Sequence, residues 1–309
     1  MKATDATRIK KDAAQLSVVS NTLLVITKLI VGIATGAISI ASEAAHSAVD
    51  LMAALIAYYA VKKSNLPPDK DHDYGHGKYE NISAMVEAML IIGAALWIVY
   101  EAADKLTSAA PPEHLGYGMA VMLLSIVVNY YVTRRLLIAA KLTESAALEA
   151  DALHLRADIW TSVGVLVGLV LIYVTGITVL DPAIALFVAA IVFRAGYKMT
   201  KESIKELTDI SLPEDEEMLI QDVINGHPEV IAFHQLRTRR SGSYRLIDVH
   251  IVLNKNMHLD KAHEICDLLE QEIKHCWGGG LCDVIIHTEP CDYHDEFGAC
   301  PFLPPEESK

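Results

Sequence analysis

The sequence predicts an α-helical membrane protein with six transmembrane helices, followed by a C-terminal cytoplasmic α+β domain. Apolar residues make up 52% of the chain and the mean hydropathy is +0.29, both high for a soluble protein. These residues gather in the first two thirds of the chain. There they form runs of about 20, the length that crosses a lipid bilayer. The last third instead has the patterns of short strands and amphipathic helices.

Six apolar spans can be placed, and the connectors around Gly32–Gly36 and Thr175–Asp181 between two pairs of them are very short. The spans cover roughly residues 14–35, 38–62, 80–107, 114–138, 146–175 and 179–202. The second span is too polar to face lipid on all sides, so part of its surface must contact protein or water. Its polar residues are Ser39, Ser42, Glu43, His46, Ser47 and Asp50.

The lysine and arginine residues between the spans predict the orientation. They lie before the first span, between the second and third, between the fourth and fifth, and after the last. The opposite connectors hold little beyond Lys105. Because cytoplasmic loops carry such an excess of positive charge, we expect both termini in the cytoplasm and an even number of spans. The membrane would be the inner (plasma) membrane of the cell.

The chain after residue 208 is expected to fold separately. Its acidic run Glu214–Glu217 favours a helix start, because negative charge stabilises a helix N-terminus. Strands are predicted over 231–238, 245–253 and 281–288, with a turn at Ser241–Ser243 and a helix over about 260–275. The resulting αββαβ order is typical of a small α+β domain. The expected parts are a transmembrane domain (1–208), the α+β domain (209–290) and a flexible tail (291–309).

The distribution of charge argues against nucleic acid as a partner. The formal net charge is −13. Residues 214–309 hold 8 Lys and Arg against 19 Asp and Glu, a balance of −11, together with 8 of the 13 histidines. Such a surface attracts cations and repels phosphate. All five cysteines lie in this last third without a CxxC pair. That spacing favours a reducing compartment over a disulfide framework.

Two pairs of ionisable residues lie inside predicted spans. His46 and Asp50 belong to the second span, and His154 and Asp158 to the fifth. Their i, i+4 spacing places both members of a pair on one helix face. Two imidazoles and two carboxylates form a ligand set suited to Zn²⁺ or a related divalent ion. A satisfied polar contact between helices is the alternative, but ionisable residues in a span by default mark an ion or proton path.

Two further clusters could bind metal outside the spans. Asp69, His72 and His76 lie in the loop after the second span, where a solvated polar loop is the alternative interpretation. The second cluster is spread over the predicted strands and helix of the α+β domain, where each histidine alone could be an ordinary surface residue. Its members are His234, His250, His263, His287 and Glu289.

Together these residues resemble the cation diffusion facilitator family of metal/proton antiporters, above all its bacterial zinc- and iron-efflux branch. The resemblance covers nearly the whole chain. It implies proton-coupled efflux of divalent cations, most of all Zn²⁺, by alternating access in a homodimer surrounded by membrane lipid. It also implies a metallochaperone-like cytoplasmic domain. The motifs that carry it are Ser42–Asp50, Tyr74–Lys78, Asp151–Asp158, Leu236–Gly242 and Asp283–His287.

The resemblance assigns roles to the three clusters. His46, Asp50, His154 and Asp158 would be the transport site. The bacterial branch usually has Asp at the first of these positions, so His46 is closer to the zinc-selective pattern of eukaryotic relatives. The loop cluster and the cytoplasmic cluster would bind further ions, although Glu289 replaces an Asp and its role as a ligand stays open. A salt-bridge interlock between the two domains would use Lys78, Asp209 and Arg239.

Two other functions remain open at this point. A membrane-anchored metal sensor or assembly scaffold would bind ions at the cytoplasmic domain without transport, but it would not need the four residues inside the spans. An intramembrane metallohydrolase would also use His and Asp ligands, but no His-Glu-x-x-His arrangement supplies a base. The ligand types do not separate Zn²⁺ from Fe²⁺, Cd²⁺, Co²⁺ or Ni²⁺.

Overall fold

The computed structural model describes residues 3–35, 38–107, 115–175, 180–277 and 282–291. It divides into two compact units, which we call the bundle unit (Thr4–Leu207) and the α+β unit (from Thr208 onward). Each unit is described by itself. Most of the expected connector around Gly32–Gly36 belongs instead to the end of the first helix, which reaches Thr35. The connector around Thr175–Asp181 falls mostly, and the flexible tail almost wholly, outside the described residues.

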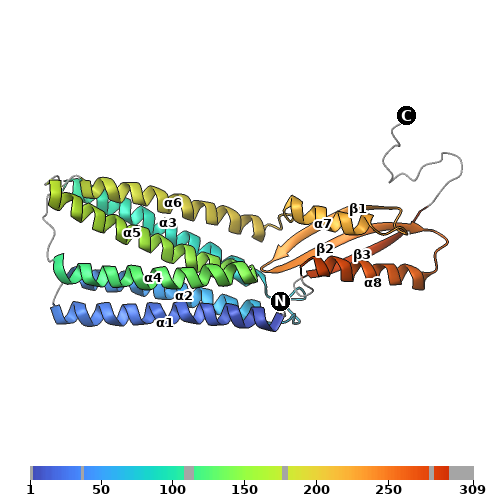
Figure 1. The fold of residues 1–309 in the computed structure, drawn as a ribbon, viewed down its shortest axis with the longest axis horizontal. Helices are drawn as coiled ribbons and strands as arrows, with labels where there is room; N and C mark the ends of the chain where they lie inside the picture. Colours follow the sequence, from blue (N-terminus) through green and yellow to red (C-terminus); the bar gives the residue numbers. More distant parts are fainter. Residues whose placement is uncertain (1–2, 36–37, 108–114, 176–179, 278–281, 292–309) are drawn as a thin grey trace, which may run out of the picture. The chain divides into compact units, whose positions relative to one another are not determined.

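Six long helices form the bundle unit (Figure 1). They are α1 Ala3–Thr35, α2 Ile38–Ser64, α3 Lys78–Thr107, α4 Leu115–Thr143, α5 Ala146–Thr175 and α6 Leu180–Leu207. Three of the helices extend well beyond the predicted apolar spans. The first helix begins at residue 3 rather than 14, the fourth ends at 143 rather than 138, and the sixth at 207 rather than 202. Hydropathy marks only the part of a helix that suits lipid, whereas these helices continue into charged sequence.

Four of the helices in the described part of the chain are long and apolar enough to cross a membrane. The four segments are Asp5–Val31, Lys78–Asp104, Met122–Thr143 and Pro182–Leu207. The helices that carry the His–Asp pairs, α2 and α5, are not among them. Six membrane spans therefore stay a prediction.

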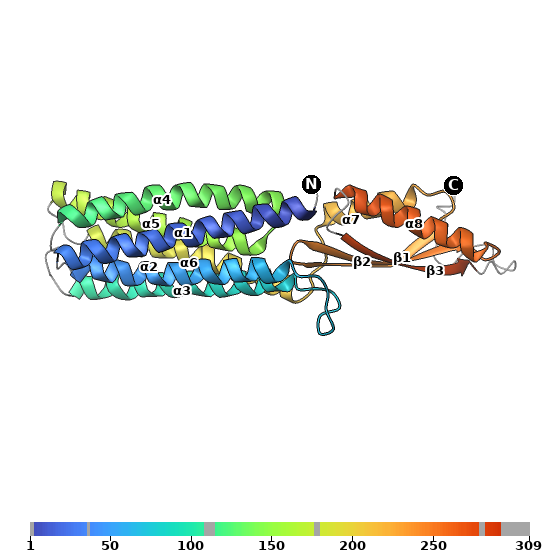
Figure 2. The same ribbon diagram turned by 90° about the horizontal axis from the view of Figure 1, so that it is seen from below.

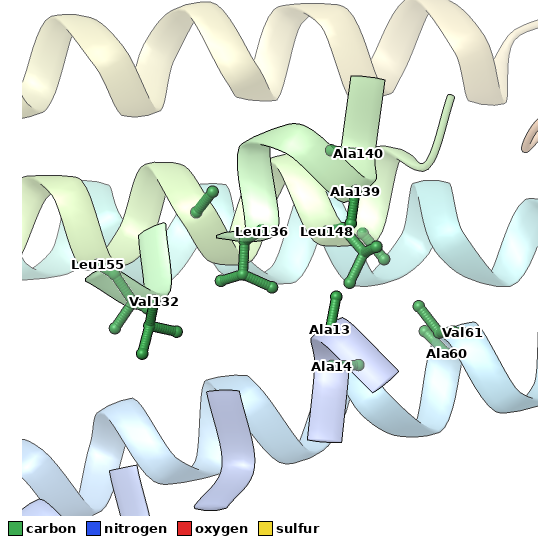
Figure 3. Packing of buried hydrophobic residues seen from close by; sticks show 12 residues of the cluster. Ala13, Ala14, Ala60, Val61, Val132, Leu136, Ala139, Ala140, Leu148 and Leu155 are labelled. Atoms are coloured by element: carbon green, nitrogen blue, oxygen red, sulfur yellow. The ribbon is translucent and has the colours of Figure 1, made fainter. Parts of the chain in front are cut away.

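Small residues allow the helices of the bundle to approach closely. Ala13 and Ala14 of α1 meet Ala60 and Val61 of α2, and aliphatic side chains of α4 and α5 complete this core (Figure 3). On the other side, α3, α5 and α6 share a second core. Here Gly164 of α5 lies so near α6 that a Cβ atom on it would come within 2.7 Å of the Val188 side chain.

A buried polar network fastens one end of the bundle. Glu80, near the start of α3, accepts a hydrogen bond of 2.8 Å from Lys10 Nζ of α1 and another of 2.8 Å from Ser64 Oγ of α2. Its other carboxylate oxygen accepts a hydrogen bond from Ser145 Oγ, directly before α5. All four residues are buried. One carboxylate thus joins four helix ends.

The α+β unit has the predicted αββαβ order. Its elements are α7 Glu214–Asn225, β1 Ala232–Ser241, β2 Tyr244–Asn254, α8 Leu259–Cys276 and β3 Cys282–Cys291. The central strand β2 pairs antiparallel with β1 and parallel with β3. The register of β1 shifts between His234 and Arg237, where Gln235 has a φ of +50°. Such a shift is a β-bulge.

Alternate residues of β2 form the core of the α+β unit. Ile247, Val249 and Ile251 are buried with residues of α7 and α8, and both helices cover the same side of the sheet (Figure 2). Because successive side chains of a strand point to opposite faces, the even-numbered residues of β2, including His250, lie on the face without helices. This alternation decides where a site can form.

An arginine pair anchors α7 to the sheet. Arg245 Nε of β2 donates a 2.6 Å hydrogen bond to Glu216 Oε2 of α7, and Arg240 binds the other oxygen of the same carboxylate. The Arg245 guanidinium also lies 4.8 Å from the ring centroid of Trp277. Desolvation raises the pKa of Glu216, but the two arginines outweigh it, so that its pKa lies below its ordinary value of 4.5.

Replacing Glu80 with Gln is expected to destabilise the bundle unit by about 3–5 kcal/mol, because it leaves the buried Lys10 ammonium without its counter-charge. Thermal unfolding of the purified protein in detergent measures the loss. The matched control is Glu202→Gln, which breaks an exposed ion pair with Lys198 in α6 and should change stability by less than about 1 kcal/mol. Equal effects of the two substitutions would contradict the structural role of Glu80.

Replacing Glu216 with Gln should destabilise the α+β unit at pH 7 by about 1–3 kcal/mol, because two arginines lose a charged acceptor. Since the pKa of Glu216 is lowered on folding, its contribution is complete above pH 4.5 and is lost as the pH falls through the lowered value. Urea unfolding followed by Trp277 fluorescence, with Trp97 and Trp160 replaced by Phe, measures the difference at each pH. A difference that grows on acidification would contradict this pairing.

Candidate metal centres

Three of the four residues predicted inside the spans meet at the interface of α2 and α5. His46 Nε2 lies 4.0 Å from Asp50 Oδ1 and 3.8 Å from Asp158 Oδ1. One ligand atom from each of the three lies within 4.8 Å of the others. The fourth residue, His154, joins through Asp50, with 3.4 Å between His154 Nε2 and Asp50 Oδ1. We call these four residues the quartet.

The quartet is mostly buried but borders a partly open cavity. The side chains of Asp50, Asp158 and His154 are 6%, 13% and 5% exposed, whereas that of His46 is 48% exposed. His154 Nδ1 and Asp158 Oδ2 are buried without a hydrogen-bond partner. All four residues line a cavity of about 460 Å³. Nitrogen and oxygen atoms that border a cavity and lack hydrogen-bond partners are suited to bind a metal ion.

Residues that the sequence analysis did not single out line the same cavity. Lys28 of α1 is buried and donates a 2.7 Å hydrogen bond to Ser47 Oγ, one residue after His46. Asn129 of α4 also lines the cavity, and its Oδ1 has no partner. A lone lysine in the middle of an apolar run was a usable signal for Lys28, because such a charge must be neutralised inside the protein.

The loop between α2 and α3 folds around Asp69. Its Oδ1 accepts hydrogen bonds of 3.0 and 2.9 Å from the backbone N–H groups of Asp71 and His72. His72 Nδ1 lies 3.2 Å from the same oxygen, and His76 Nε2 lies 3.2 Å from Oδ2. Gly75, with a φ of +77°, allows this tight path. Ligand atoms of Asp69, His72 and His76 lie within 4.8 Å of one another.

Three histidines lie in one row across the sheet of the α+β unit. The register pairs His234 with His250 and His250 with His287, and their neighbouring ring centroids are 5.2 and 4.6 Å apart. Glu289 extends over this row. Its Oε2 lies 3.0 Å from His234 Nε2, and its Oε1 lies 2.8 Å from His250 Nδ1. His287 Nε2 is 3.8 Å from Glu289 Oε1.

The structure does not bring His263 to this row. His263 belongs to α8, which packs against the face of the sheet that carries Val249 and Ile251, whereas His250 lies on the opposite face. The His263 side chain is 75% exposed, and its Nε2 is 3.8 Å from Asp267 Oδ2 of the same helix. In contrast, Glu289, whose role the sequence left open, lies at the centre of the cluster.

Two carboxylates outside the spans have lowered pKa values. Desolvation raises the pKa of Asp69, but hydrogen bonds from Asp71 and His72 outweigh it, and its pKa lies below 3.8. For Glu289, the hydrogen bond from His250 is the main cause that holds the pKa below 4.5. Both side chains are therefore ionised at neutral pH, which is the form of a carboxylate that binds a metal ion.

Part of the predicted interlock lies within the α+β unit. Arg239 Nη1 is 3.2 Å from Asp209 Oδ1, and Asp209 itself has a φ of +58°. Lys78 is the first residue of α3 and belongs to the bundle unit. An interaction of Lys78 with Asp209 therefore stays a prediction.

Comparison with known proteins assigns both units to one family. Residues 14–208 match the family model of the cation efflux transmembrane domain, and residues 212–291 match that of the cytoplasmic domain of cation efflux proteins. The chain is 35% identical to an uncharacterized transporter, sll1263, of Synechocystis, over 84% of this chain and 83% of the relative. It is 32% identical to the cation-efflux pump FieF of Cronobacter sakazakii, over 95% and 97%.

Among solved structures, the chain is similar to the metal-bound C-terminal domain of the CzcD transporter from Thermotoga maritima. The identity is 30% over 25% of this chain and 87% of that domain, with a TM-score of 0.24. The family models cover the two units almost end to end. The protein is thus an integral membrane protein of the cation diffusion facilitator family, a cation-efflux transporter of the bacterial branch rather than an enzyme.

Proposed function

We propose that this protein exports divalent transition-metal ions, above all Zn²⁺, from the cytoplasm in exchange for protons. The observation that carries this proposal is the meeting of His46, Asp50, His154 and Asp158 beside a partly open cavity. Two imidazoles and two carboxylates match the nitrogen and oxygen donors that Zn²⁺ accepts. Because they come from only two helices, a movement of α2 against α5 can assemble or separate the set.

Proton exchange follows from the chemistry of the same four side chains. Imidazole and carboxylate must lose their protons to bind a metal and can take protons up when it leaves. The 3.4 Å contact of His154 with Asp50 is one in which a proton can replace the metal as the bridge. Alternating exposure of the quartet to the two sides of the membrane would then move metal outward and protons inward.

The preference for Zn²⁺ is proposed from the ligand types. Imidazole suits zinc, whereas an all-carboxylate set suits harder ions such as manganese. His46 is the most exposed member of the quartet, so it is also the ligand that an entering ion reaches with least rearrangement. Ligand type alone leaves Fe²⁺, Co²⁺, Ni²⁺ and Cd²⁺ as competing substrates.

We further propose six spans in the inner membrane with both termini in the cytoplasm, because lysine and arginine gather in the connectors on one side. In the α+β unit, His234, His250 and Glu289 offer two imidazoles and one carboxylate whose ligand atoms lie within 4.8 Å, a set that suits a regulatory zinc ion. The match to the cytoplasmic domain of cation efflux proteins supports a homodimer. Such an ion would favour one arrangement of the two subunits.

The alternative function, a sensor or scaffold without transport, is favoured by one observation only. The loop and α+β clusters are both preformed and lie outside the spans. Neither cluster requires the quartet or its cavity. A sensor would therefore have no use for the quartet.

Replacing Asp50 or Asp158 with Ala should abolish metal-driven proton flux in proteoliposomes, because each substitution removes a ligand and a proton carrier. Asp12→Ala is the matched control, since it removes an exposed carboxylate of α1 and should leave the flux unchanged. Full flux in the Asp50 and Asp158 variants would remove the quartet from the mechanism. No flux of any ion by the wild type, with metal still bound by the α+β unit, would favour the sensor.

Replacing His46 with Asp should broaden the range of ions carried. A third carboxylate makes the set harder, so that flux of the harder ion Mn²⁺ should rise relative to Zn²⁺ flux. Stopped-flow measurement of proton release for Zn²⁺, Cd²⁺, Fe²⁺ and Mn²⁺ gives the ranking. His72→Asp, a similar change in the loop, is the control, and its ranking should equal that of the wild type. An unchanged ranking after His46→Asp would show that His46 does not select the ion.

A further inference from the structure

A second pair of carboxylates is buried in the bundle unit. Glu87 belongs to α3 and Asp151 to α5, and both are completely buried. Their helices, α3 and α5, pack against each other, and the charge of Asp151 acts on Glu87. Around them the facing helices carry small side chains, Ala84 and Ala88 on α3 and Ala150 on α5. Neither carboxylate belongs to the three clusters described above.

Both carboxylates lack the partners that burial requires. Ser83 Oγ donates a long hydrogen bond of 3.4 Å to Glu87 Oε1, but Glu87 Oε2 has no partner. Ser17 of α1 lies beside Asp151, yet neither oxygen of Asp151 has a hydrogen-bond partner of normal geometry. Among residues 3–291 as far as they are described, no lysine or arginine forms an ion pair with either side chain. Two bare negative charges are costly in this setting, so the pair must hold protons or a cation.

The position of the pair connects it with the quartet. Asp151 precedes His154 by three residues and Asp158 by seven, so all three lie on one face of α5. At a rise of about 1.5 Å per residue, Asp151 lies about 5–10 Å along the helix from them. It lies toward the end of the bundle where Ser145 binds Glu80, which is the cytoplasmic end in the proposed orientation.

We propose that Glu87 and Asp151 form a second cation site, which a divalent metal ion occupies between the cytoplasm and the quartet. This inference rests on the proposed export function. Two carboxylates with the nearby hydroxyl groups of Ser83 and Ser17 offer oxygen ligands only. For Zn²⁺ this set is weaker than one that includes imidazole. A weaker site before a stronger one lets an ion leave water and then move on. Protons neutralise the pair when no ion is present.

A binding measurement tests the site without any transport. Its starting protein is the full chain with Asp50→Asn and Asp158→Asn, in which the quartet is disabled. Adding Glu87→Gln and Asp151→Asn should lower the Zn²⁺ bound at saturation by one ion per chain, as counted by mass spectrometry of metals after equilibrium dialysis. The loop and α+β clusters contribute equally to both proteins. Equal amounts of bound Zn²⁺ would overturn the second site, whether or not the wild type transports.

Flux measurements then test whether the transported ion passes through this second site. Glu87→Gln or Asp151→Asn, each with the quartet intact, should raise the KM for Zn²⁺ about tenfold with little change in maximal flux, because binding before the transport step is lost. Since the amides keep the shape of the side chains, a merely structural role predicts an unchanged KM. A KM equal to that of the wild type, or a loss of maximal flux alone, would overturn the proposal.

The conservative variant Asp151→Glu separates charge from packing. It keeps the carboxylate but adds a methylene group in a fully buried position, which a structural role would tolerate less than the amide. A cation site predicts the opposite order, with KM retained in Asp151→Glu and raised in Asp151→Asn. The metal-free amide variant should also unfold at the same or a higher temperature than the wild type, because the amide is neutral without having to take up a proton. A lower unfolding temperature would assign Asp151 to packing instead.

Discussion

The cost of placing a charge inside an apolar bundle governs this structure. Every buried ionisable group there must find a counter-charge, a set of hydrogen bonds, a proton or a metal ion. Glu80 finds Lys10 and two hydroxyl groups, all from the protein itself. The quartet is completed only in part, since atoms of His154 and Asp158 stay without partners. The same physical rule therefore separates a residue that holds the bundle together from residues that await a ligand.

Close helix packing makes these polar contacts possible. Alanine and glycine at the interfaces bring the helix backbones near enough for short side chains to meet across them. Where α5 meets α6, Gly164 leaves no room for a Cβ atom beside Val188. The quartet lies on α2 and α5, so one of its two helices is tightly fitted to a neighbour.

Much of the fold could be predicted from the sequence, because its signals are local. Runs of apolar residues located the helices, and alternation located the strands, although hydropathy shortened α1, α4 and α6 where they continue into charged sequence. The i, i+4 spacing of His46 and Asp50 also predicted a shared helix face.

What the sequence could not supply was the pairing of distant segments. The row of His234, His250 and His287 depends on strand register, and the place of His263 depends on which face α8 covers. Lys28 and Glu87 belong to no spaced pair, so only their place inside an apolar run could have identified them.

The bulge in β1 has a consequence for how this strand tolerates insertions and deletions. On β1, three steps lead from His234 to Arg237, while on β2 only two lead from His250 to Asp248. The extra residue reverses the alternation of β1, so that His234 faces the histidine row while Thr238 faces the helices and binds Leu212 and Glu217. If all residues of β1 paired with β2 without the bulge, one end of the strand would shift by one position. Either His234 would turn into the helix-covered core, or Arg237 would take the buried place of Thr238. Deleting one residue at the bulge, such as Gln235, would instead leave both pairings in register. The strand can thus lose a residue at the bulge without turning over either end.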